Sequence, residues 1–266
     1  MSDQKAMHIP PYTFGIAQSF TDLDTGMRPF PGHYLLYAAT GAFHLEVERT
    51  QWLLPPQRAA LIAADVPIRL QTRGTVACNS VLFVREAFAP PAAPCRVFSV
   101  TPLAREMLLY TMRWGMQRDP DAPEAMRFFA ALADVCTNLA AHPDQFWLPR
   151  PHSPELIRAV SFAFDHLDAD LTIDAAAHAA SVSARTLLRR FAHETNLSWR
   201  SFLGRARMIR AMELLETHGP PVIEVAAATG FESVSAFSTA FRRFTGETPS
   251  QYRRRLVGIS PVFPHS

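Results

Sequence analysis

The period of the hydrophobic pattern changes near residue 100. Before that point the apolar runs are short, and Phe43–Glu48 alternates apolar with polar residues as a half-buried strand does. Pro, Gly and Asp turn signals separate it from the other strand candidates, which are Tyr34–Tyr37, Trp52–Leu54, Ala60–Ile62, Ile68–Leu70 and Ser80–Val84. Short strands at this spacing predict a small β-sandwich or barrel.

Helical spacing replaces this pattern from Thr101–Pro102 onward. Thr is a favoured N-cap and Pro suits the first helical position, so a helix is expected to begin here. A second helix is expected over Glu124–Ala141. The expected apolar faces are Leu103, Met107, Tyr110 and Trp114 on the first helix and Phe128, Leu132, Val135 and Leu139 on the second. The prolines of residues 142–154 cannot continue a helix, so this stretch is expected to be an interdomain linker.

Two segments after the linker repeat one plan about 50 residues apart. In the first, a short helix over 172–180 is broken at Ser181–Ser183 and followed by a helix over 184–194. In the second, a short helix over 222–228 is broken at Gly230–Ser233 and followed by a helix over 234–244. A short helix, a tight turn and a cationic second helix make up the helix-turn-helix plan.

A continuous helix over Ser198–Thr217 separates the two segments. At about 1.5 Å per residue it spans roughly 30 Å, so it could hold two recognition helices about one DNA turn apart. One chain would then occupy successive major grooves. Four arginines decorate this helix, at positions 200, 205, 207 and 210, and its apolar side carries Phe202, Met208, Ile209, Met212 and Leu215.

Charge is distributed unevenly along the chain. The formal net charge is +2, but residues 183–255 carry twelve arginines against six acids, which leaves the remainder acidic. This asymmetry predicts a polyanion-binding module attached to a part with another function. The three cysteines, Cys78, Cys95 and Cys136, lack metal or disulfide spacing and are expected to be reduced. No membrane-length apolar run and no signal-peptide pattern are present, so a cytoplasmic protein is expected.

The C-terminal hundred or so residues closely resemble the AraC-type family of bacterial transcription regulators. The matching positions form a long pattern with fixed spacing, namely Ser183, Leu187, Phe191, Glu194, Arg207, Ala211, Leu214, Leu215, Val225, Ala226, Gly230, Phe231, Ser233, Phe237, Phe241, Arg242, Gly246, Thr248, Pro249, Tyr252 and Arg253. The resemblance implies an all-α domain of two helix-turn-helix units whose recognition helices enter the major groove.

By position, the resemblance implies DNA contacts from Arg185, Leu188 and Arg189 in the first unit and Val234, Ser235, Ser238 and Thr239 in the second. The paired basic steps near the helix ends add Arg190, Arg242 and Arg243. Arg185 and Arg189 lie one helical turn apart and could each bind guanine bidentately. Short hydroxyl side chains discriminate bases weakly, so the first unit is expected to supply most of the sequence specificity.

Two positions depart from the family pattern. Members usually have Gly where this chain has Ser181 in the first turn and Asn196 after the first recognition helix. Asn tolerates a left-handed backbone, so Asn196 is a mild substitution. Ser181 leaves the geometry of the first turn open.

The N-terminal segment resembles the cupin-like sensor domain found in many AraC-type regulators. The resemblance is carried by Leu35–Gly41, Leu54–Ala59, Ala63–Pro67 and Pro102–Glu106, with Ile68 where relatives often carry histidine. It implies a β-barrel with appended helices that binds a small-molecule effector. Candidate pocket residues are His33, Tyr37, Trp52 and Phe83, although aromatic residues of this set are also candidates for the core.

A metal site built from His33, His44, Glu46 and Glu48 is the alternative use of this domain. The last three alternate with apolar residues, which predicts a solvated strand face instead. No catalytic triad, phosphate loop or zinc motif is present in the sequence, so we expect neither a metal, nor a cofactor, nor an enzyme. A metal-dependent cupin enzyme fused to a DNA-binding domain remains the competing hypothesis.

The sequence therefore predicts an α+β protein with four parts: a cupin-like barrel over 1–100, a helical segment over 101–142 that is a candidate for dimerisation, a linker over 143–154 and the DNA-binding domain over 155–266. Its expected function is sequence-specific, effector-controlled transcription regulation. The expected partners are double-stranded DNA, a small-molecule effector, RNA polymerase and a second copy of the chain, and no membrane.

Overall fold

The computed structural model describes residues 9–257 except 73, 88, 90, 170 and 217–219. The chain forms two compact units, each of which draws on two stretches of sequence. The first unit comprises residues 1–47 and 54–144, and the second comprises 48–53 and 145–266. The protein is α+β, with a β-rich N-terminal region and a helical C-terminal region.

The first unit is built on an antiparallel five-stranded sheet with the order β1-β7-β2-β5-β8. Strand β3 pairs antiparallel with β6 in a second sheet. The strands of this unit are β1 (Phe14–Thr21), β2 (His33–Thr40), β3 (Phe43–Val47), β5 (Arg58–Ile62), β6 (Ile68–Gln71), β7 (Thr75–Phe83) and β8 (Cys95–Ser99), and its helices are η1 (Arg85–Ala87), α1 (Pro102–Tyr110), η2 (Thr111–Arg113) and α2 (Pro123–Ala140).

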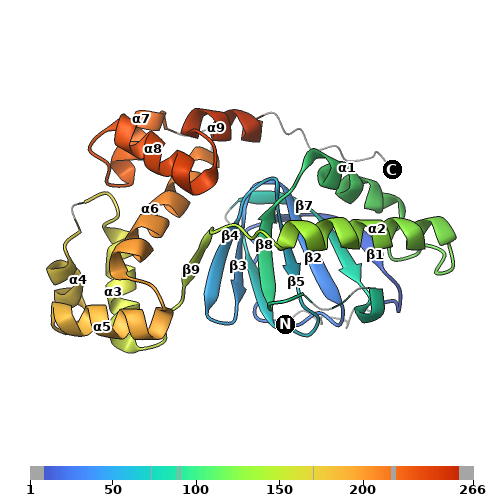
Figure 1. Ribbon diagram of the computed structural model, residues 1–266, viewed down its shortest axis with the longest axis horizontal. Coiled ribbons are helices and arrows are strands. Elements are labelled where there is room, and N and C mark those ends of the chain that lie inside the picture. The colour runs from blue at the N-terminus through green and yellow to red at the C-terminus, as the bar shows by residue number, and fades with distance from the viewer. Residues whose placement is uncertain are drawn as a thin grey trace. The chain divides into compact units, whose positions relative to one another are not determined.

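Helices α1 and α2 lie over one face of the five-stranded sheet (Figure 1). Strand residues such as Leu35, Val81 and Phe98 and helix residues such as Leu108 and Phe129 belong to one buried cluster. Thr101 caps α1 as expected, because its hydroxyl accepts the Ala104 N–H at 3.3 Å. The apolar packing of a sheet face against two helices accounts for this buried cluster.

The predicted apolar faces of both helices are rotated relative to the faces that are buried. On α1, Leu103 is 64% exposed and Tyr110 is 44% exposed, whereas Ala104 and Leu108 are buried. On α2 the buried face contains Phe129, Leu132 and Cys136, with Phe128, Val135 and Leu139 only half-buried or exposed. Both helices bury alanines as well as large apolar side chains, so the pattern of large apolar residues alone does not define the buried face.

The six strand segments expected from the sequence fall largely within strands β2 to β7, and the alternation over β3 is confirmed because Phe43, Leu45 and Val47 are buried. The sequence pattern does not predict β1 or β8. Both are edge strands of the five-stranded sheet, and β1 buries only its first two residues fully, so its sequence shows little alternation.

The second unit contains seven helices among its described residues and the antiparallel pair β4–β9. The elements are β4 (Thr50–Leu54, whose last residue falls to the first unit), β9 (Trp147–Pro149), α3 (Pro154–Asp165), α4 (Ile173–Ala179), α5 (Ala184–Thr195), α6 (Trp199–Glu216), α7 (Val222–Ala228), α8 (Val234–Thr245) and α9 (Pro249–Val257). In Figure 1, α6 runs between the α3–α5 group and the α7–α9 group.

The stretch expected to be a linker contains a strand, β9, which pairs with β4 through Thr50–Pro149, Gln51–Leu148 and Trp52–Trp147. The prolines exclude a helix, so the sequence pattern indicated a linker. They do not exclude a short edge strand, and such a strand forms here. The expected end of the long helix at Thr217 lies outside the described residues. No helix in the described part of the chain is long and apolar enough to cross a membrane.

Candidate nucleic-acid interface and effector pocket

The second unit contains the same two-helix arrangement twice. Each residue of α5 has its counterpart 50 positions later in α8, as the pairs 184 and 234 and 195 and 245 show. The short first helices, α4 and α7, start 49 positions apart, at 173 and 222. The second turn is therefore one residue longer than the first, while the two longer helices match throughout.

Equivalent caps begin and end the two longer helices. The Ser183 hydroxyl accepts the Thr186 N–H at 3.2 Å, and the Ser233 hydroxyl accepts the Ala236 N–H at 3.2 Å. Both helices end at a left-handed residue, Asn196 with φ 55° and Gly246 with φ 86°. The prediction that Asn196 tolerates the left-handed conformation is confirmed.

The first turn closes despite its serine. Ser181 adopts the left-handed region with φ 57°, and its counterpart Gly230 has φ 73°. A Cβ on Gly230 would lie 2.6 Å from the Leu167 carbonyl oxygen and 2.7 Å from the Arg207 guanidinium. Glycine is therefore required at position 230 for two reasons, whereas position 181 tolerates a side chain at the cost of backbone strain.

Each longer helix buries one face and presents the opposite face to solvent. Leu187 and Phe191 on α5 and the equivalent Phe237 and Phe241 on α8 are fully buried. Of the predicted DNA-contacting residues, the exposed ones are Arg185, Leu188, Arg189, Arg190, Ser235, Thr239, Arg242 and Arg243, and those of intermediate burial are Val234 and Ser238. The outer face of α5 thus carries arginines where α8 carries hydroxyls.

Arg190 differs from the other arginines of α5 because it is paired within the protein. Its Nη1 lies 2.5 Å from the Glu155 carboxylate near the start of α3. Backbone hydrogen bonding at the start of that helix and the Arg190 guanidinium hold the pKa of Glu155 below its usual value. This pair joins α5 to α3, a role that no sequence motif indicates.

The helix α6 has the composition expected of a spacer. It contains 18 residues, which corresponds to about 27 Å at 1.5 Å per residue, and its predicted apolar side is buried. Three of its four arginines contact the protein: Arg207 donates to the Ala169 carbonyl at 3.0 Å, Arg210 pairs with Glu213, and Arg205 lies over the Trp147 ring.

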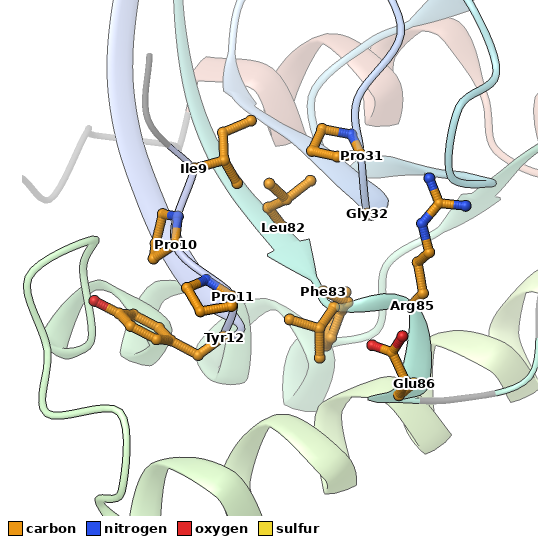
Figure 2. A pocket seen from close by; sticks show the side chains of 11 residues that line it. Ile9, Pro10, Pro11, Tyr12, Pro31, Gly32, Leu82, Phe83, Arg85 and Glu86 are labelled. Carbon is orange, nitrogen blue, oxygen red and sulfur yellow. The ribbon is translucent and has the colours of Figure 1, made fainter.

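One pocket of the first unit, about 270 Å³, lies where β2 begins and β7 ends. Figure 2 shows Ile9, Pro10, Pro11 and Tyr12 on one side of it and Pro31 and Arg85 on the other. Gly32, Leu82, Phe83, Val84 and Glu86 complete the lining. The N-terminal wall is held in place by the Tyr12 hydroxyl, which donates to the Met116 carbonyl at 2.7 Å, and by Arg118 over the Tyr12 ring.

Of the four predicted pocket residues, Phe83 lines this pocket. His33 is buried next to Gly32, and Tyr37 belongs to the core cluster beneath α2. Trp52 lies in the second unit, where its ring is 6.2 Å from that of Trp147. Sequence reasoning missed Tyr12 and Arg85, because they flank strands in the sequence and only the folded chain brings them to one pocket.

His33 hydrogen bonds two loops, one of which lines the pocket at Arg85. Its Nδ1 accepts the Ala64 N–H at 3.1 Å, and the ring also hydrogen bonds the backbone of Arg85. Burial lowers the pKa of His33 below its usual value. Beside it, Arg85 pairs with Asp65. Among the described residues, no three His, Cys, Asp or Glu side chains come together in a way that could hold a metal ion.

The chain is similar to several known proteins. Residues 176–255 match the family model described as a helix-turn-helix domain. The HTH-type transcriptional regulator NimR of Escherichia coli strain K12 is 29% identical over 229 residues, which cover 85% of this chain and 81% of NimR. The regulatory protein SoxS of the same strain is 32% identical over 97 residues, which cover 36% of this chain and 91% of SoxS. A crystal structure of ToxT from Vibrio cholerae O395 is 13% identical with a TM-score of 0.40, covering 93% of this chain and 99% of ToxT.

Proposed function

Because this chain belongs to the AraC-type family of DNA-binding transcriptional regulators, we propose that α5 and α8 are its two recognition helices and that they read successive major grooves of one duplex. The observation that carries this proposal is the matched pair of helices, which bury equivalent residues and leave equivalent outer faces exposed. The intervening helix is about 27 Å long, which is comparable with one DNA turn of about 34 Å.

We propose further that the two helices contribute unequally. Arg185 and Arg189 can each make a bidentate contact with guanine, whereas the equivalent Ser235 and Thr239 can make only single hydrogen bonds. The first helix then supplies most of the base discrimination and the second supplies mainly affinity through Arg242 and Arg243.

The experiment is selection of duplexes from a random library by the full chain, followed by footprinting at two salt concentrations. We expect a salt-sensitive footprint over two adjacent major grooves. Arg189→Ala should relax base preference in one half-site, with a loss of about 1–3 kcal/mol of discrimination. The Ser238→Ala/Thr239→Ala double variant should leave base preference largely intact, and equal relaxation by both variants would contradict the unequal roles.

For the first unit we infer a cupin-like sensor that controls DNA binding through a small apolar effector. The pocket beneath the N-terminal segment supports this inference, since its lining is mostly apolar with Arg85 and Glu86 at its edge. An effector acts only by binding one arrangement of the protein better than another. A metabolite panel should contain a compound that changes DNA affinity, and Leu82→Phe, which narrows the pocket, should weaken that response.

The named relatives are transcriptional regulators, which favours regulation over metal-dependent catalysis. We also propose that the protein acts in the cytoplasm, contacts RNA polymerase and self-associates. Exposed apolar side chains on α1 and α2, namely Leu103, Tyr110 and Met126, support self-association through these helices. Sedimentation of the full chain tests this, and a monomer at micromolar concentration would contradict it.

A further inference from the structure

The nine residues 145–153, which we call the clasp, contact the last turn of both α5 and α8. Its partner on α5 is Glu194 and its partner on α8 is Phe244, which are 50 residues apart and so occupy equivalent positions of the two helices. Neither contact was expected, since the sequence predicted a linker here.

On α8 the clasp is held by aromatic packing. Phe146, which is fully buried, packs against Phe244 with ring centroids 5.4 Å apart. The neighbouring Trp147 ring lies 4.4 Å from the Arg205 guanidinium of α6, and Arg205 also donates to the Gln145 side chain at 3.4 Å. Burial lowers the pKa of Arg205, and a cation desolvated in this way gains more from facing an aromatic ring.

On α5 the clasp is held by hydrogen bonds to a carboxylate. The Glu194 carboxylate, with 10% of its side chain exposed, accepts the backbone N–H groups of His152 and Ser153, the latter at 3.0 Å. It also lies 2.7 Å from His152 Nδ1. Glu194 therefore satisfies the N-terminus of α3 in place of the Ser153 hydroxyl, which makes no capping bond.

We propose that the clasp positions the two recognition helices independently, through Phe146 for α8 and through His152 and Ser153 for α5. These residues do not touch DNA. They act through the last turn of each helix, so they set how well each helix fits its groove. This inference rests on the proposed function. The experiment below distinguishes failure of the positioning role from failure of the proposed DNA-reading function.

The experiment is quantitative footprinting of full-length variants on a duplex selected by the wild-type protein, with half-site occupancies measured separately. Arg189→Ala identifies the half-site that α5 reads. Phe146→Leu should lower occupancy of the α8 half-site by about tenfold, because its ring contact with Phe244 is lost, and leave the α5 half-site within about twofold. Glu194→Gln should have the reverse pattern.

Two further variants separate positioning from general destabilisation. Phe244→Leu removes the same ring contact from the α8 side, where the side chain is only half-buried, and should reproduce the Phe146→Leu pattern, which covers the case in which Phe146→Leu does not fold. Phe129→Leu changes another buried phenylalanine, in the first unit, and any loss it causes should be equal at both half-sites.

Equal losses at both half-sites from Phe146→Leu and Glu194→Gln, or no loss from either, would overturn the proposal. If the wild-type protein selects no duplex, the proposed DNA-reading function itself fails. A two-groove footprint that responds to neither variant would support that function and contradict the positioning role of the clasp.

Discussion

Arginine side chains of the second unit fall into two groups, those paired within the protein and those presented to solvent. Arg190 pairs with Glu155, and Arg207 donates to the Ala169 carbonyl. Arg185 and Arg189 are exposed on the outer face of α5. Residue type alone does not separate these groups, because the guanidinium donates to phosphates, bases, carboxylates and backbone carbonyls alike.

His33 leads to a residue-scale prediction about pH. Its pKa is lowered by burial, so the unfolded chain binds a proton more readily than the folded chain does. The stability that neutral His33 contributes is therefore complete above about pH 6.5, the ordinary histidine value, and is lost as pH falls through the lowered folded-state pKa. Chemical denaturation of the full chain from neutral to mildly acidic pH measures this as a fall in the free energy of unfolding.

His33→Asn is the matched variant, because the Asn carbonyl can still accept the Ala64 N–H but does not titrate. We expect its free energy of unfolding to depend less steeply on pH than that of the wild type below about pH 6.5. Identical pH dependence in the two proteins would show that His33 is not responsible.

At the scale of the elements, the two helix-turn-helix turns adopt the same left-handed backbone conformation with different residues. Ser181 and Gly230 both place a left-handed residue after the first helix of each helix-turn-helix. Only at Gly230 does neighbouring structure, the Leu167 carbonyl and the Arg207 guanidinium, occupy the place of a side chain. The first turn therefore stores backbone strain that the second avoids.

Two substitutions with opposite signs test this comparison. Ser181→Gly removes the strain of a left-handed serine and should raise the free energy of unfolding by about 0.5–1 kcal/mol. Gly230→Ala should lower it by about 2 kcal/mol or more, because a clash adds to the backbone strain. Thermal unfolding of both full-length variants measures the two effects, and stabilisation by Gly230→Ala would contradict the account.

At the scale of the whole molecule, positive charge is concentrated in the second unit. Residues 183–255 carry twelve arginines against six acids in a chain of net charge +2. Such a segment binds DNA largely by releasing counterions from phosphates, so affinity should fall linearly on a logarithmic salt scale. The exposed Arg242 and Arg243 at the end of α8 are placed to contribute.

The Arg242→Gln/Arg243→Gln double variant should reduce the magnitude of that salt slope by about two, since each phosphate contact contributes about 0.9. Base preference should not change. Arg127→Gln, an exposed arginine of α2 in the first unit, is the control with the same chemistry and should leave the slope unaltered. An unchanged slope in the double variant would show that Arg242 and Arg243 do not contact phosphates.

The sequence by itself determined the class of protein and the helices of the two helix-turn-helix units. Thr101 caps α1 as predicted, and Asn196 takes the left-handed conformation. These features depend on residues within a few positions of one another, so local periodicity and capping chemistry are sufficient to find them. The family was identified in a similar way, from a long motif of fixed spacing.

Three features were decided only by the tertiary structure. They are the buried faces of α1 and α2, the pocket that Tyr12 and Phe83 line together, and the contacts of residues 145–153 with two helices. Phe146 and Phe244 are nearly a hundred residues apart, and their contact leaves no periodic trace in the sequence. Proline-rich segments look like linkers because their local signals only exclude helices. Long-range packing then assigns them a structure, through contacts that depend on the whole unit being folded.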